Sequence, residues 1–114
     1  MVCTRINLKK TEIKKIISDI KDTSNIIFIR RMNEPEKDPY SFFLELGIDY
    51  KDALNIIKCL THNDYQYSLF DMNNKFNYLH IFYKEISDKI AYIKLGFKKD
   101  KTVVISFHEK IYEN

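Results

Sequence analysis

Three residues whose types suit proton and phosphate chemistry lie in two neighbouring runs near the C-terminus. Tyr92 and Lys94 fall in "IAYIKLGF", and His108 ends "TVVISFH". Both runs alternate apolar and polar residues, which is typical of strands with one buried face. An odd-numbered turn centred on Asp100 would pair the runs as a hairpin with Tyr92 opposite His108.

A third alternating run, "FNYLHIFYKEI", precedes these two and is joined to them by "SDK". We predict that Leu79, Ile81 and Tyr83 point toward the core, which leaves Tyr78, His80, Phe82 and Lys84 outward. An odd loop centred on Asp88 would then place Lys84 opposite Tyr92. Lys84, Tyr92 and His108 would form one row on an open sheet face, with neighbouring Cβ atoms about 5 Å apart.

This row holds the groups that metal-free RNA cleavage requires. The 2'-hydroxyl must lose a proton, the phosphorane must be stabilised, and the leaving 5'-oxygen must gain a proton. We expect His108 to act as acid or base, Tyr92 as a proton relay, and Lys84 and Lys94 as phosphate clamps, while Tyr78 and Phe82 could stack a base. By pattern alone, the same alternation is more typical of an ordinary solvated sheet face.

Further residues could contact an RNA backbone. Arg30 and Arg31 end the run "IIFIRR", and Lys98, Lys99 and Lys101 form a basic turn that we expect near His108. His80 is a second candidate on the outward face, either as an RNA contact or as a partner of a neighbouring loop. Each of these cations could equally serve solubility alone.

Helical patterns dominate the first half of the chain. Residues 10–22 carry isoleucines at helical spacing, and residues 40–47 and 50–60 read as two more helices, the first closed by Gly47 and the second capped by Asp49. A short strand is expected at residues 26–31, and the three alternating runs are expected to form an antiparallel meander. The prediction is an α+β fold of two layers, with N-terminal helices packed on a C-terminal sheet.

Bulk properties limit the classes of protein. A chain of 114 residues fits one domain, residues 1–114, and the net charge of +3 permits a nucleic-acid partner without requiring one. No apolar run approaches the roughly 20 residues of a membrane span, and the start lacks a signal-peptide core, so a cytoplasmic protein is expected. The two cysteines form no CxxC pair, and no metal or cofactor site is expected.

The order of several short motifs resembles the MqsR (motility quorum-sensing regulator) family of bacterial type II toxins. The run "FFLELGIDYKDALNIIKCLTHNDY" is followed by "FYKEISDKIAYIKLGF" and "VVISFHEKIY". The resemblance spans residues 26–112. It implies a RelE-like fold and an mRNA endoribonuclease that is held inactive by a cognate antitoxin.

The resemblance also implies site residues. Family members use a lysine after the helix, a glutamine on the next strand, a tyrosine in the "YIK"-like strand and a lysine after "ISF". The tyrosine corresponds to Tyr92, whereas the other three positions are Tyr67, Leu79 and His108 in this sequence. We therefore include Tyr67 among the expected RNA contacts.

The resulting hypothesis is a metal-independent mRNA endoribonuclease toxin that leaves a 2',3'-cyclic phosphate. Its expected partners are mRNA and an antitoxin protein, and the sequence leaves open whether the ribosome takes part. The alternative is a non-catalytic binding protein on the same fold, such as a phage-encoded inhibitor, that presents the basic open face. An antitoxin or repressor is disfavoured because no helix with clustered base-reading side chains is visible.

Overall fold

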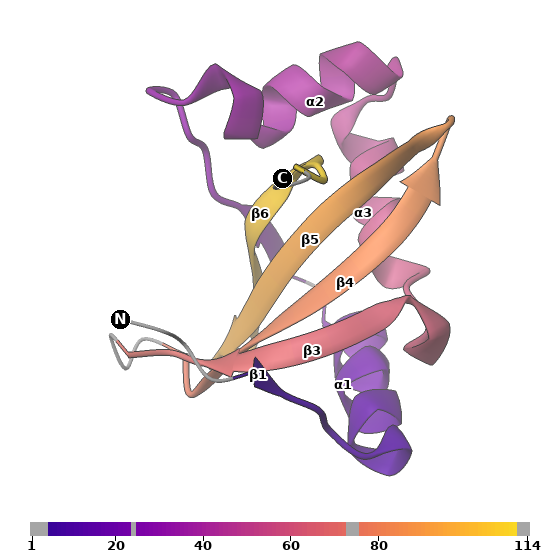
Figure 1. Ribbon diagram of the computed structural model, residues 1–114, viewed down its shortest axis with the longest axis vertical. Helices are drawn as coiled ribbons and strands as arrows, with labels where there is room; N and C mark the ends of the chain where they lie inside the picture. The colour runs from indigo at the N-terminus through magenta and orange to yellow at the C-terminus, as the bar shows by residue number, and fades with distance from the viewer. Residues whose placement is uncertain (1–4, 24, 73–75, 112–114) are drawn as a thin grey trace.

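The computed structural model describes residues 5–23, 25–72 and 76–111 and has an α+β architecture, as predicted (Figure 1). The strand order in its sheet is β1-β3-β4-β5-β6-β2. The strands are β1 (Arg5–Ile6), β2 (Asn25–Phe28), β3 (Tyr65–Phe70), β4 (Tyr78–Ile86), β5 (Lys89–Lys98) and β6 (Lys101–Glu109). All neighbours are antiparallel except β2 and β6, which are parallel.

The three α-helices lie where the sequence predicts, with bounds within two residues of the predicted ones. Helix α1 (Lys10–Asp22) buries Ile13, Ile17 and Ile20. Helix α2 (Pro39–Leu46) ends at Gly47, whose φ of 72° is the left-handed conformation that glycine adopts without strain. Helix α3 (Tyr50–Lys58) is capped by Asp49, whose carboxylate accepts a 2.8 Å hydrogen bond from the Asp52 amide. Two 3₁₀ turns, Pro35–Lys37 and His62–Asp64, complete the helical elements.

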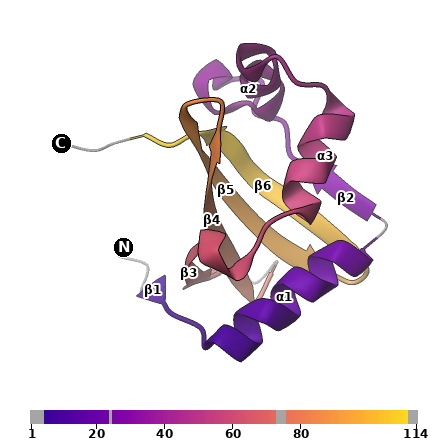
Figure 2. The ribbon, with the colours of Figure 1, turned by 90° about the vertical axis from the view of Figure 1, so that its right-hand side faces the viewer.

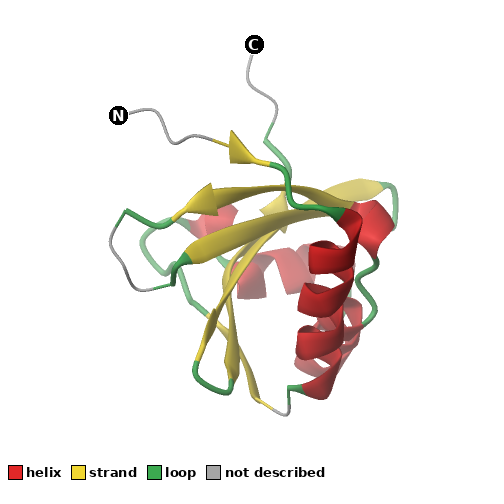
Figure 3. Ribbon diagram, turned by 90° about the horizontal axis from the view of Figure 1, so that it is seen from below, coloured by secondary structure: helices red, strands yellow, loops and turns green. Residues whose placement is uncertain are grey.

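Helices α1 and α3 cover one face of the sheet, and no α-helix of the described residues covers the other face (Figure 2). Figure 3 shows the same two layers from below. The side chains between the layers include Ala91, Ile93 and Leu95 of β5 and Phe107 of β6, all fully buried. This confirms the predicted inward face of β5, and it leaves Tyr92 and Lys94 on the open face. Among the described residues, the helices are too short or too polar to span a bilayer.

The predicted orientation of β4 is wrong. Tyr83 pairs with Tyr92 and Ile81 with Lys94, so Tyr83 lies on the open face and Lys84 on the helix face. The cause is the turn between β4 and β5. Ser87 and Asp88 both have positive φ, at 49° and 70°, which makes a two-residue turn instead of the predicted odd loop. One residue fewer in the loop reverses every side chain of the strand.

The β5–β6 hairpin reaches the predicted pairing by a different route. Its turn, Lys99–Asp100, is also two residues long and pairs Lys98 with Lys101. The register then shifts between Leu95, opposite Val104, and Lys94, opposite Ser106, so Ile105 is the extra residue of a β-bulge. Val104 is therefore in the core, against the prediction, whereas Tyr92 still pairs with His108.

Strands β1 and β3 were not predicted. The polar ends of "THNDYQYSLFDMNNK" indicate a loop, but Tyr65–Phe70 pairs with β4 and carries a bulge between Tyr65 and Tyr67. Strand β1 pairs with β3 at one edge of the sheet, and β2 pairs with β6 at the other edge. Both edges carry the chain segments that complete the cavity described next.

Candidate active site

A cavity of about 510 Å³ opens on the helix-free face of the sheet. Five cationic side chains, three tyrosines and a histidine contribute to its wall, and no carboxylate does so among the described residues. The polar lining consists of Arg5, Arg31, Lys37, Lys94, Lys110, Tyr67, Tyr83, Tyr92, Ser106 and His108. Such a cavity fits a polyanion with flat groups attached.

Tyr92 and His108 face each other across β5 and β6 in the centre of this cavity. Their ring centroids are 5.2 Å apart with an interplanar angle of 21°, so the two rings are stacked. Tyr83 lies on the other side of Tyr92, with ring centroids 6.1 Å apart. The row on the open face is thus Tyr83, Tyr92 and His108, and the predicted Lys84 is replaced by a second phenol.

The His108 imidazole is held in one tautomer. Its Nδ1 lies 2.8 Å from the carbonyl oxygen of Glu109, and because a carbonyl can only accept, Nδ1 carries the proton. The lone pair of the neutral ring is then on Nε2. Burial has the largest effect and lowers the pKa of His108. The Glu109 hydrogen bond opposes it, and the positive charges of Lys37, Arg31 and Lys94 lower the pKa further. At neutral pH His108 is therefore a neutral base.

The pKa of the Tyr92 phenol is shifted in the opposite direction. Burial raises the pKa of Tyr92 to about 12, and the neighbouring Tyr67 and Tyr83 phenols raise it as well, the first partly through a side-chain hydrogen bond. Tyr92 therefore keeps its proton throughout the physiological range. The stacked pair combines a base that is unprotonated with a hydroxyl that is protonated.

The cations reach the cavity from both edges of the sheet. The Arg5 guanidinium of β1 lies over the Tyr67 ring at 4.1 Å, and the Lys110 ammonium lies 5.2 Å from the centroid of Tyr83. Arg31 and Lys37 come from the loop after β2. Both are 3.5 Å from a carboxylate oxygen of Glu34, an ion pair that holds the two cations together on this loop.

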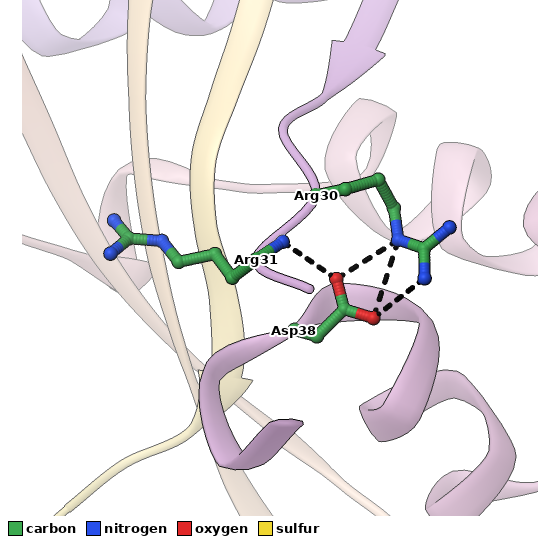
Figure 4. A network of polar contacts seen from close by, with 3 residues as sticks. All are labelled: Arg30, Arg31 and Asp38. Carbon is green, nitrogen blue, oxygen red and sulfur yellow. Dashed lines mark hydrogen bonds and ion pairs between the residues drawn. The ribbon is translucent and has the colours of Figure 1, made fainter. Parts of the chain in front are cut away.

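The loop after β2 is fixed by a buried carboxylate. Asp38 accepts hydrogen bonds from Arg30 Nε and Nη2, both at 2.9 Å, and from the Arg31 backbone amide at 2.8 Å. In Figure 4 the Arg30 side chain extends away from Arg31, on the other side of the Asp38 carboxylate. Arg30 also covers the Tyr40 ring at 3.9 Å. Asp38 thus ties the backbone of Arg31 in place while the Arg31 side chain lines the cavity.

Five of the predicted site residues line the cavity, namely Tyr92, Lys94, His108, Arg31 and Tyr67. Lys84 does not, because it lies on the helix face with its Nζ 3.5 Å from Asp64 Oδ2. The predicted role of Lys84 as a phosphate clamp is therefore wrong for this cavity.

The predicted outward orientation of His80 is also wrong. His80 pairs with Leu95, is buried on the helix side, and has its Nδ1 2.7 Å from Ser68 Oγ. Ser68 Oγ is in turn 2.7 Å from the Tyr65 hydroxyl. Phe82 is fully buried in the core. Neither ring is available to RNA on the open face.

The other predicted contacts lie away from the cavity. Arg30 is occupied by Asp38, and Tyr78 shares the strand face of His80 and contacts the Phe70 ring at 6.0 Å. Lys98, Lys99 and Lys101 surround the β5–β6 turn, at the far end of β6 from His108. Seven strand residues of about 3.3 Å each separate Lys101 from His108, so this basic turn is roughly 20 Å from the candidate site.

Sequence reasoning missed Arg5, Lys37, Lys110 and Tyr83. Arg5 is in a two-residue strand, and Lys37 follows a proline-containing loop, so neither shows a periodic pattern. Alternation alone places Tyr83 on the inward face, and that placement implies the odd loop. A two-residue turn at Ser87–Asp88 is the local signal that reverses it.

A family model described as "Motility quorum-sensing regulator, toxin of MqsA" matches residues 17–109. The matched span includes Tyr92, Lys94 and His108. No curated protein matches the chain.

Proposed function

Because this chain belongs to the motility quorum-sensing regulator (MqsR) family of toxins, we propose that it is an endoribonuclease toxin whose active site is the cationic cavity. The observation that supports this most directly is the stacked pair of a neutral histidine and a protonated tyrosine among five cations. The family also implies a cognate antitoxin, which we propose as the protein partner.

The first proposed step is removal of a proton from the RNA 2'-hydroxyl by Nε2 of His108. Nδ1 is already committed to the Glu109 carbonyl, so Nε2 is the only ring atom that can accept a proton. The resulting 2'-oxygen attacks the adjacent phosphorus. The carbonyl of Glu109 then stabilises the imidazolium, which carries a proton on each nitrogen.

The second step is departure of the 5'-oxygen with a proton. Tyr92 donates its phenolic proton to this oxygen and takes one from the adjacent imidazolium, so the 5'-hydroxyl receives the proton of Tyr92, and the proton lost by the 2'-hydroxyl restores the phenol. The products are a 2',3'-cyclic phosphate and a free 5'-hydroxyl. Arg31, Lys37 and Lys94 stabilise the extra negative charge of the phosphorane, and all required charges come from side chains.

Purified protein and its His108→Ala variant, incubated with a labelled mRNA in EDTA, test this proposal. The wild type should make discrete cuts that end in a 2',3'-cyclic phosphate, and the variant should make none while its circular dichroism spectrum is unchanged. Equal cutting by both proteins would remove His108 from the mechanism. Intact RNA with folded wild type, with and without ribosomes, would leave the alternative, a protein that binds RNA in the cavity without cutting it.

A further inference from the structure

Arg5 lines the cavity at the β1 edge of the sheet, and the mechanism proposed above makes no use of it. Tyr92 is on β5 and His108 on β6, whereas Arg31 and Lys37 follow β2 at the opposite edge. In the order β1-β3-β4-β5-β6-β2, Arg5 is therefore on the Tyr92 side of the catalytic pair (Figure 1). The cavity thus has cations on both sides of this pair.

The backbone that carries Arg5 is fixed on β3. Arg5 is opposite Leu69 in the pairing of β1 with β3. The Tyr65 hydroxyl donates a 3.3 Å hydrogen bond to the carbonyl oxygen of Ile6, and the Leu8 amide lies 3.4 Å from the same hydroxyl. These contacts hold the short strand β1 in place and keep Arg5 at the edge of the cavity.

The Arg5 guanidinium lies over the Tyr67 ring, 4.1 Å from its centroid. A guanidinium carries five N–H donors, and an aromatic ring attracts its charge without taking up these donors as an oxygen would. Arg5 is exposed, and none of the ion pairs between described residues includes it. Its fork of N–H groups suits a phosphate, which arginine binds in a bidentate manner.

Arg5 is also close to the catalytic phenol. The Tyr67 hydroxyl forms a hydrogen bond with the Tyr92 hydroxyl, which places the guanidinium over Tyr67 roughly 6 to 7 Å from the Tyr92 oxygen. Burial raises the pKa of Tyr92 to about 12, and the smallest effect on this pKa is a lowering by the charge of Arg5. One nucleotide of a single strand can span the distance from Tyr92 to Arg5.

The order of the catalytic pair gives the RNA a direction. His108 takes the proton of the 2'-hydroxyl, which belongs to the nucleotide on the 5' side of the cut, and Tyr92 protonates the leaving oxygen of the nucleotide on the 3' side. Because the attacking and leaving oxygens lie on opposite sides of the phosphorus, the strand passes His108 before Tyr92. The 3' nucleotide then continues from Tyr92 toward β1, where Arg5 lies.

We propose that Arg5, supported by the Tyr67 ring, binds the phosphate next to the scissile one on its 3' side, so that RNA crosses the sheet with its 5' end toward β2 and its 3' end toward β1. This inference rests on the proposed function, because the direction follows from the roles of His108 and Tyr92. A dinucleotide has no phosphate beyond the scissile one and should accordingly be a poor substrate.

Cleavage of a short RNA with one cut site tests the direction. The linkage directly 3' or directly 5' of the cut is replaced by an uncharged methylphosphonate, and kcat/KM is measured. For the wild type, the 3' replacement should lower kcat/KM roughly tenfold, since a charge-assisted hydrogen bond is lost. Arg5→Ala should be slower by a similar factor and lose nothing more on the 3' replacement, while the 5' replacement should affect both proteins equally.

Binding tests the phosphate contact without any cleavage. The ligand is a fluorescent single strand with 2'-deoxy nucleotides throughout, which cannot be cut, and its affinity is measured by anisotropy at several salt concentrations. Each phosphate that a protein neutralises on a single strand contributes about 0.7 to the slope of log affinity against log salt, so Arg5→Ala should reduce the slope by about this amount. Lys14→Ala is the matched control, because it removes one exposed positive charge from α1, on the other side of the sheet, and should leave the slope unchanged.

A salt slope that Arg5→Ala leaves unchanged overturns the phosphate site, whether or not the protein cuts RNA. A 3' replacement that slows Arg5→Ala as much as the wild type places Arg5 elsewhere and also overturns the proposal, and a dependence of the 5' replacement on Arg5 reverses the direction. A smaller salt slope in Arg5→Ala, in a protein that never cuts RNA, supports the phosphate site and rejects the endoribonuclease together with the direction, so the two proposals fail separately.

Discussion

His80 and His108 lie on opposite faces of the same sheet and are buried to nearly the same extent, with 6% and 7% of each residue exposed. Burial lowers the pKa of both. Their partners differ. His80 contacts Ser68 and the Phe97 ring on the helix side, whereas His108 contacts Tyr92 and borders the cation-rich cavity.

Burial alone does not distinguish the two histidines. His80 has its Nδ1 committed to a serine hydroxyl that is itself fully buried, so no substrate can reach that pair. His108 has its Nδ1 committed to a backbone carbonyl, which leaves Nε2 for a substrate. The difference lies in what each ring nitrogen contacts and in whether a cavity adjoins it.

The largest expected difference is between the variants His108→Ala and His80→Ala, compared for RNA cleavage and for stability. Loss of a general base should lower RNA cleavage by about 10²- to 10⁴-fold in the first variant. The second should keep the cleavage rate per folded molecule, yet lose about 1 to 3 kcal/mol of unfolding free energy, since Ser68 loses a buried partner. Cleavage rates and urea titrations on both proteins measure this. Loss of cleavage in folded His80→Ala would contradict the assignment.

The pH dependence of stability tests the His80 side of the comparison. Burial lowers the pKa of His80 from 6.5 to about 4, so between these values the unfolded chain binds a proton that the folded chain does not. Stability from His80 is complete above pH 6.5 and is lost as the pH falls toward 4, by roughly 3 kcal/mol in total. Urea titrations at several pH values should show a flatter acid limb in His80→Gln. His108 contributes in the same direction, so the variant keeps part of the slope.

Lys94 and Lys84 extend the contrast to neighbouring strands. Lys94→Ala removes a cation from the cavity and should lower cleavage roughly 10- to 100-fold. Lys84→Ala removes only an ion pair with Asp64 on the helix face, worth about 0.5 kcal/mol of stability, and should leave cleavage unchanged. Single-turnover cleavage of one RNA by both variants is the measurement. A larger effect at Lys84 would restore the orientation predicted from the sequence.

The smallest expected effects concern the loop after β2. Asp38→Asn removes the ion pair with Arg30 and should cost about 1 kcal/mol of stability and weaken RNA binding several-fold, because Arg31 is held less firmly.

Glu34→Gln on the same loop should act in the opposite direction and strengthen RNA binding slightly, since it releases Arg31 and Lys37 from their carboxylate partner. Anisotropy with a 2'-deoxy strand distinguishes the signs, and weaker binding in both variants would mean that Glu34 supports the loop.

Sequence patterns predicted the helices and the α+β class because these depend on local periodicity. The orientation of β4 could not be predicted from alternation, since Ile81 and Phe82 point to opposite faces and are both fully buried. The turn alone decides between them. The Tyr92–His108 pairing was right partly by compensation, because the bulge at Ile105 supplies the residue that the predicted odd turn would have supplied.

That cations from both edges of the sheet meet at one cavity could not be predicted, for another reason. Arg5, Arg31 and Lys37 reach the cavity only through the pairing of the two edge strands, which joins segments far apart in the chain. No local signal in one sequence reports such pairings.

The parallel pairing of β2 with β6 has a kinetic consequence. It aligns Asn25 with Lys101 and Phe28 with Val104, and a contact between such distant segments closes slowly. The loop that carries Arg31 and Lys37 follows β2 directly, so it cannot take its place until this pair has formed. On a ribosome, strand β2 therefore cannot pair until β6 has emerged. A newly made chain gains all the cations that line the cavity only at the end of folding.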